Sequence, residues 1–191
     1  MRKTAHLRVY RNLISSKKPS GFTLVELLVV IAIIAVLAAV IVLIINPLEL
    51  TRRSRDAARL TDLSNLQQAI NVAVQEATTS GAAILCKSAG AYPCNGSSHT
   101  GTRASDGTGW VKADLSAQKS VSVPTLPIDP INDTAKHYTY CADTDAWEIN
   151  TALESDQLKV KMTSDGGDED DKYEVGSKLD LIMATGGSCT Y

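Results

Sequence analysis

The feature that most constrains the fold is an apolar run from Phe22 to Ile45, in which Glu26 is the only charged residue. At about 1.5 Å per residue, a helix over this run is about 36 Å long, enough to cross the hydrocarbon core of a bilayer. Lipid offers no hydrogen bonds to the backbone, so we predict a helix although the run is rich in Val and Ile. A carboxylate is costly inside such a span, which marks Glu26 as a functional residue that needs a partner.

A basic leader precedes the apolar run. Residues 1–21 carry six Lys and Arg residues and no acidic residue. The order of polar leader, Gly21 and apolar run differs from that of a secretory signal peptide, in which the cleavage site follows the apolar region. A cut after Gly21 would remove residues 1–21 and leave Phe22 as the new N-terminus. Four arginines follow the run, so the excess of basic residues before it predicts a single-pass membrane protein with a cytoplasmic N-terminus and its C-terminal part outside.

The chain beyond the leader is acidic, and its composition argues against two classes of function. It holds 13 basic and 21 acidic side chains. Because contact with phosphates requires clustered Lys and Arg, we expect no nucleic acid to bind the isolated domain. We also expect no enzyme, since neither His99 nor His137 lies in a nucleophile motif such as Gly-x-Ser-x-Gly.

A second helical pattern follows Asn46-Pro47, where proline predicts a kink. Residues 52–78 contain no Gly or Pro, and their apolar residues recur at steps of three and four, as in an amphipathic helix. These residues are Leu60, Leu63, Leu66, Ile70, Val74 and Ala77. We therefore predict one long helix from about Phe22 to Thr79, spanning the membrane in residues 22–45, amphipathic in 46–80, and capped by Gly81.

Residues 81–191 predict a small domain outside the membrane. Residues 82–118 are rich in Gly, Ser and Thr, and we expect an exposed loop there. Residues 119–191 have the patterns of short strands around a turn at Asp143–Asp145. The candidate strands are 138–141, 146–152, 159–162, 173–175 and 179–183. An antiparallel sheet of some of these strands would cover the apolar stripe of the helix.

Four cysteines lie beyond the leader. An even number in a small exported domain indicates disulfides and leaves their pairing open. Free thiols are one alternative. A zinc site is a weaker one, because the chain has no Cys-x2-Cys pair. We favour Cys86–Cys94, which closes a short local loop, and Cys141–Cys189, which attaches the C-terminus.

The stretch from Gly21 to Ile34, with the basic leader before it, closely resembles the N-terminal methylation motif of type IV pilins and type II secretion pseudopilins. The resemblance implies an α+β fold, with a long N-terminal helix packed on a small antiparallel sheet. It also implies cleavage after Gly21 by a prepilin peptidase and methylation of the Phe22 amine. Assembly at an inner-membrane platform would then give a homo-oligomeric helical filament.

Two further segments bear on the type of filament and on cofactors. Residues 126–130 (Leu-Pro-Ile-Asp-Pro) resemble a stretch of major pseudopilins but lack the Trp-Gly that usually follows it. Major pseudopilins carry a C-terminal Ca²⁺ site, and the acidic run 165–171 could supply part of the about six to eight oxygens that Ca²⁺ needs. Asp165, Asp168 and Asp170 are the candidate ligands, although such runs are usually solvated turns. No other cofactor is expected.

In a filament, the Glu26 carboxylate could pair with the Phe22 ammonium of a neighbouring copy. Each charge is costly alone in an apolar core, and pairing offsets much of that cost. A copy out of register would leave both charges unpaired, so the pair would set the axial register. The alternative is a monomeric, membrane-tethered binding domain, which would keep Met1 instead of starting at Phe22.

Overall fold

The computed structural model describes residues 21–77, 81–87, 91–116, 119–120, 123–183 and 185–190. It divides into two compact units, Met1–Ile45 and Asn46–Tyr191. An apolar N-terminal helix is followed by helices and a four-stranded antiparallel sheet. The predicted α+β class and pilin-like arrangement of elements are confirmed.

The first unit contains helix α1, Leu24–Ile45. Its stretch Leu24–Val42 has a mean hydropathy of 3.2, and none of it is buried within the chain. The helix is therefore long and apolar enough to cross a membrane, and its described side chains are exposed in the single chain. Only lipid or other protein can cover them.

A local break at Asn46 separates α1 from α2, Pro47–Glu76. Asn46 has a left-handed backbone (φ 43°), and its side chain accepts a hydrogen bond from the Glu49 amide at 3.4 Å. Pro47 takes the first position of α2, where its missing N–H costs no helical hydrogen bond. The predicted continuous helix is thus interrupted at the proline, where a kink was expected.

The end of α2 differs from the prediction. The helix ends at Glu76, and Ala77 is already extended. Gly81 begins the short helix α3, Gly81–Leu85, so its prediction as the cap of the long helix was wrong. The predicted end at Thr79 lies outside the described residues.

The sheet consists of β1 (Cys94–Ser97), β2 (Thr139–Asp143), β3 (Ala146–Thr151) and β4 (Tyr173–Gly176), in that spatial order and antiparallel throughout. The turn at Asp143–Asp145 is confirmed: it joins β2 to β3, and Thr144 has a φ of 55°.

The prediction missed one strand, and two of its strand assignments were wrong. β1 lies within the predicted loop 82–118, residues 159–161 form a 3-10 helix, and residues 179–183 contribute only a bridge between Ile182 and Cys189.

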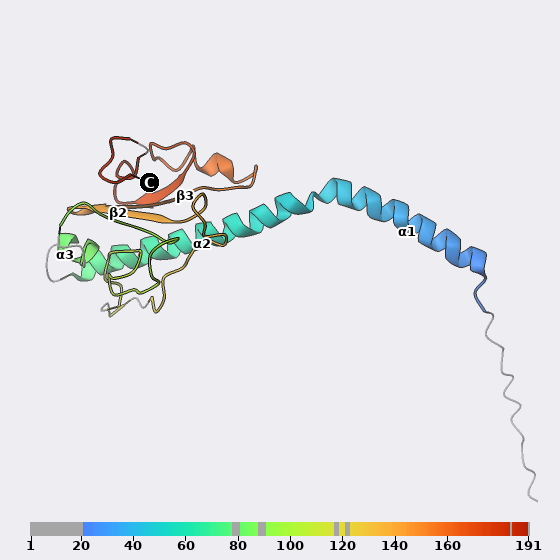
Figure 1. The fold of residues 1–191 in the computed structure, drawn as a ribbon, viewed down its shortest axis with the longest axis horizontal. Coiled ribbons are helices and arrows are strands. Elements are labelled where there is room, and N and C mark those ends of the chain that lie inside the picture. The colour runs from blue at the N-terminus through green and yellow to red at the C-terminus, as the bar shows by residue number, and fades with distance from the viewer. Residues whose placement is uncertain are drawn as a thin grey trace, which may run out of the picture. The chain divides into compact units, whose positions relative to one another are not determined.

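One face of the sheet packs against α2 (Figure 1). The predicted stripe supplies Leu63, Leu66 and Ile70, all of them buried. The segment predicted as an exposed loop also contributes to this core. Its Trp110 is fully buried, donates a hydrogen bond to the Pro127 carbonyl at 2.9 Å and lies 5.8 Å from the Tyr138 ring. A composition rich in Gly and Ser hid these core residues.

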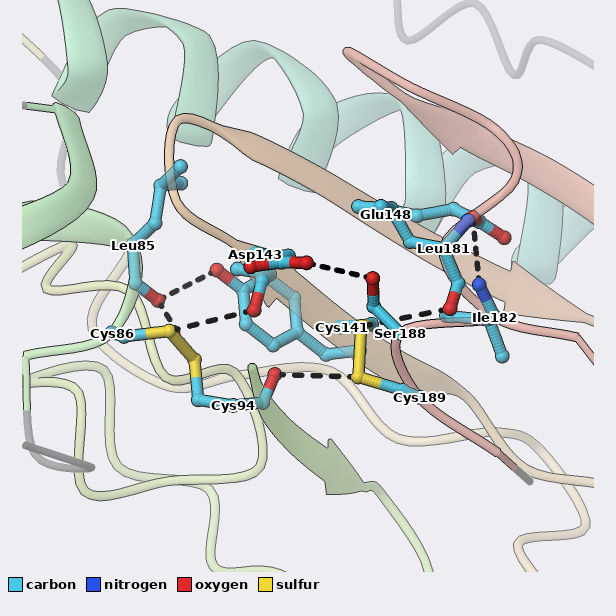
Figure 2. The surroundings of a disulfide bond; sticks show 12 residues. Leu85, Cys86, Cys94, Cys141, Asp143, Glu148, Leu181, Ile182, Ser188 and Cys189 are labelled. Atoms are coloured by element: carbon cyan, nitrogen blue, oxygen red, sulfur yellow. Dashed lines mark hydrogen bonds between the residues drawn. A yellow bond between two sulfur atoms is a disulfide. The ribbon is translucent and has the colours of Figure 1, made fainter. Parts of the chain in front are cut away.

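The opposite face of the sheet is covered by the C-terminal segment. Leu181, Ile182 and Cys189 form a second buried cluster with Cys141 of β2. The structure joins Cys86 to Cys94 and Cys141 to Cys189, the pairing favoured from the sequence. Figure 2 shows the two bridges side by side, with the Cys189 sulfur 3.8 Å from the Cys94 carbonyl oxygen.

A fully buried arginine connects α2 to two distant loops. The Arg59 guanidinium forms a bidentate pair with Asp129, with contacts of 2.6 and 2.9 Å. It also contacts Asp56 at 2.8 Å and Glu154 at 2.5 Å. The helical pattern predicted that the Arg and Asp residues of α2, which include Asp56 and Arg59, face the solvent. Asp56 and Arg59 can be buried because their charges are paired.

The pKa values in this network follow from its contacts. Burial by itself would lower the pKa of Arg59, but its hydrogen bonds with Asp129 and Glu154 raise that pKa overall. Hydrogen bonding by Arg55, together with Arg59, lowers the pKa of Glu154 to about 2. Arg59, Asp129 and Glu154 are therefore ionised at neutral pH, and their contacts hold residues 129 and 154 against α2.

Removing one partner should show how much this network stabilises the domain. Asp129→Ala leaves the Arg59 charge buried with fewer partners, so we expect the free energy of unfolding to fall by about 3–5 kcal/mol. Urea unfolding of the full chain in non-ionic detergent can be followed by the fluorescence of the buried Trp110 and Trp147. The control Asp180→Ala breaks the exposed Lys178–Asp180 pair and should leave stability close to wild type. Equal effects of the two variants would contradict the assignment.

Candidate functional site at the start of the apolar helix

The residues around the predicted cut precede α1 and are open to solvent. Phe22 is 82% exposed. A side chain at Gly21 would meet no atom within 4 Å. The helix begins only at Leu24, so the Gly21–Phe22 bond lies in non-helical chain. The described structure on the C-terminal side of this bond leaves it accessible to another protein.

Thr23 and Glu26 form a capping box at the start of α1. The Glu26 amide donates to the Thr23 hydroxyl oxygen at 3.2 Å, and the Thr23 amide donates to Oε2 of Glu26 at 2.8 Å. The Thr23 hydroxyl donates to the same Oε2, also at 2.8 Å. A Thr followed three residues later by Glu satisfies two backbone N–H groups that a helix start otherwise leaves unpaired.

This geometry fixes the Glu26 carboxylate four residues beyond Phe22. The hydrogen bonds from Thr23 converge on Oε2 of Glu26. The side chain also lies in the first turn of α1, where the helix dipole favours negative charge. The local structure therefore holds the carboxylate in place at the entrance to an apolar helix. Such a group can accept an ammonium as its counter-charge.

The other predicted site residues lie in the second unit. The four cysteines form the two disulfides described above. Among the calcium candidates, Asp165 is half-buried and accepts from the amides of Gly167 and Glu174, whereas Asp168 and Asp170 are exposed. Within the described residues, no three acidic, His or Cys side chains are placed to hold a metal ion together. Calcium binding stays a prediction from the sequence.

Two contacts were missed in the sequence, one at the candidate site and one in the core of the second unit. The Thr-x-x-Glu pattern at residues 23–26 is visible there, and it predicts the capping box. The Arg59–Asp129 pair has no comparable signal, because its members are 70 residues apart. Only the fold brings them together.

A scan against protein families matches residues 16–42 to the prokaryotic N-terminal methylation motif. The chain therefore carries the prepilin-type motif, as its sequence indicated. The match spans the end of the leader, the capping box and most of α1. Searches of curated proteins and of solved structures found no match.

The capping box can be tested by amide hydrogen exchange. Thr23→Val removes the hydroxyl that accepts from the Glu26 amide, and loss of such a cap costs about 1 kcal/mol. We expect the Glu26 amide to exchange about fivefold faster in NMR spectra of the full chain in micelles. Thr51→Val is the matched control, because its hydroxyl donates to the Pro47 carbonyl in α2. Unchanged exchange at Glu26 in the Thr23 variant would rule out the cap.

Proposed function

We propose that this chain is a structural subunit of a helical filament, either a type II secretion pseudopilus or a type IV pilus. It would be cleaved after Gly21 and N-methylated at Phe22. The methylation motif at residues 16–42 supports this proposal, and so does the open structure around the cut. The subunit would have no catalysis of its own, since pilin-like proteins are typically non-enzymatic.

The observation that carries the proposal is a charged residue on a wholly exposed apolar helix. Among the described side chains of α1, Glu26 is the only charged one. Before assembly, lipid would cover the helix and leave Glu26 near its polar end. In a filament, the helices of other copies would cover it, and the Phe22 ammonium of a neighbour would supply the missing positive charge.

The proposal also assigns partners and location. A prepilin peptidase would cut the Gly21–Phe22 bond, and an inner-membrane assembly platform would add copies to the filament. The motif and the apolar helix suggest membrane anchoring with an extracytoplasmic domain. The leader would lie in the cytoplasm before cleavage. Residues 46–191 would then stand outside the membrane and, after assembly, on the filament surface.

Glu26→Gln separates the two roles of this side chain. Glutamine can complete a capping box, so the start of α1 should remain intact. It carries no charge, so the ion pair with a neighbour is lost. We expect the variant to be cleaved and to reach the membrane. Its filaments in sheared fractions should amount to less than about a tenth of those of the wild type. Such a decrease corresponds to a loss of more than about 1.4 kcal/mol of assembly free energy.

Two comparisons make this test specific. Glu26→Asp keeps the charge on a shorter side chain and should assemble better than Glu26→Gln. Thr23→Val weakens the cap and keeps the charge, so it should still assemble. Normal filament abundance in Glu26→Gln would contradict the ion pair, and assembly failure in Thr23→Val alone would assign the effect to the cap.

A further inference from the structure

A row of polar side chains crosses the face of the sheet that points away from α2. Thr139 of β2 lies two residues before Cys141, which belongs to the buried cluster on that face, so the two side chains share it. Thr139 pairs with Ser97 of β1 and with Asn150 of β3. Directly paired residues of an antiparallel sheet have their side chains on the same face. Three neighbouring strands therefore present two hydroxyl groups and an amide in one row.

Two adjoining cavities lie along this row. The larger has a volume of about 510 Å³ and is lined by residues of β1, including Ser97, and of the loop after it. The smaller has a volume of about 280 Å³ and is lined by Asn150 and by residues near the starts of β2 and β4. His137 and Thr139 line both cavities. We call the two cavities together the polar groove.

The smaller cavity is lined by two buried residues whose side chains hold an unpaired polar atom. Asn150 is 2% exposed and Thr151 is 1% exposed. Within the described residues, neither Nδ2 of Asn150 nor Oγ1 of Thr151 has a hydrogen-bond partner. A buried polar atom without a partner destabilises a folded domain, and most such atoms in native proteins are paired. These two atoms therefore point to a ligand, and Nδ2 of Asn150, which only donates, requires an acceptor on it.

The charge of the polar groove is opposite to that of the surrounding domain. The chain beyond the leader holds 21 acidic and 13 basic side chains. None of the described residues that line the groove is acidic, whereas Lys112 lines the larger cavity and Lys172 the smaller. The Lys112 ammonium donates to the Gly109 carbonyl at 2.9 Å, and this contact keeps its charge beside β1. The groove therefore favours a ligand with negative charge.

Hydrogen bonds fix one wall of the groove. The Asn132 side chain donates to the Ser98 carbonyl at 3.1 Å and accepts from the Ser98 hydroxyl at 2.7 Å. The same hydroxyl oxygen accepts from the Tyr138 amide at 2.9 Å. Nδ1 of His137 lies 3.0 Å from the Asp133 carbonyl oxygen, which fixes the ring. This wall is formed before a ligand arrives, so binding requires little ordering of the chain.

The other lining groups indicate the kind of anion. Ser, Thr and Asn make up more than half of the described lining residues, and their side chains both donate and accept, as sugar hydroxyls do. The only apolar side chains among the described lining residues are those of Ala135 and Ala152, which offer little to the side chains of a peptide. The described lining also has no Arg, Phe, Tyr or Trp, the residues with which proteins contact phosphates and stack bases.

We propose that the polar groove binds an acidic polysaccharide, in which the carboxylate of one uronic acid unit accepts from the Asn150 amide and the Thr151 hydroxyl. Hydroxyl groups of that unit and of the next bond to Thr139 and Ser97. Neighbouring strands are about 4.8 Å apart, so the row from β1 to β3 spans about 10 Å and holds more than one sugar unit. The Lys112 ammonium pairs with a further carboxylate. The groove belongs to a single chain, so binding does not require assembly into a filament.

Isothermal titration calorimetry of the full chain in non-ionic detergent tests the proposal. The probes are hexamers of galacturonic acid and of mannuronic acid, with maltohexaose as the neutral hexamer. A chelator is present, so that no cation joins the sugar to the acidic run 165–171. We expect at least one acidic hexamer to bind at least about tenfold more tightly than maltohexaose, as the loss of a hydrogen bond to a charged group implies. Added NaCl should weaken this binding.

Two variants assign the binding to the groove. Asn150→Leu replaces the unpaired amide with an apolar group of similar size, so affinity should fall at least about tenfold while the Tm stays equal or rises. Lys112→Gln removes one charge and should weaken binding of the acidic hexamer severalfold without changing that of maltohexaose. Lys159→Gln is the matched control, because it removes a positive charge from the 3-10 helix 159–161, outside both cavities. It should keep the wild-type affinity.

Five results would overturn the proposal. Failure of both acidic hexamers to bind would exclude the ligand class, and equal affinity for maltohexaose would show that the carboxylate is not recognised. Unchanged affinity in both groove variants would place the binding elsewhere. A Tm lower by more than about 5 °C in Asn150→Leu would show that the amide has a partner within the chain. Binding of a thymidine dodecamer that both variants abolish would identify the ligand as a nucleic acid instead.

Discussion

The exposed apolar surface of α1 is the constraint on which the rest of this protein depends. The helix has one charged residue among its described side chains, and the residues that the structure describes leave its stretch Leu24–Val42 unburied. Such a surface is unstable in water, so lipid or other copies must cover it. The capping box of Thr23 and Glu26 fits this constraint, because it satisfies backbone groups at the helix start without other residues.

The second unit, Asn46–Tyr191, has a hydrophobic core of its own. α2 provides one side of that core, and the four-stranded sheet provides the other. The buried Arg59 fixes two loops to α2 through Asp129 and Glu154. The Cys141–Cys189 disulfide and the Glu148 side chain attach the C-terminal segment to the sheet. These polar and covalent connections suit a small domain, whose hydrophobic core alone is limited.

The sequence predicts those parts of the fold that depend on local pattern. Four features have a periodic or turn signal within a single segment of the sequence. They are the apolar run, the proline break, the hairpin at residues 143–145 and the apolar stripe of α2. Contacts between distant segments have no such signal. For this reason the sequence predicted that Arg59 and Glu148 face the solvent. It also predicted an exposed loop for the segment that contains Trp110 and β1. At the candidate site, Gly21, Phe22 and Glu26 follow from a local motif, whereas the pairing of Glu26 with another copy stays a proposal.

The central claim is that the Phe22 amine and the Glu26 carboxylate of different copies meet in a filament. Electron microscopy of filaments formed by the intact gene product, at a resolution that shows side chains, would measure the distance between these two groups directly. The account predicts chains that begin at a methylated Phe22, with its nitrogen within about 4 Å of a Glu26 carboxylate oxygen on a neighbouring copy. Filaments whose subunits retain Met1, or in which each Glu26 contacts only its own chain, would contradict it.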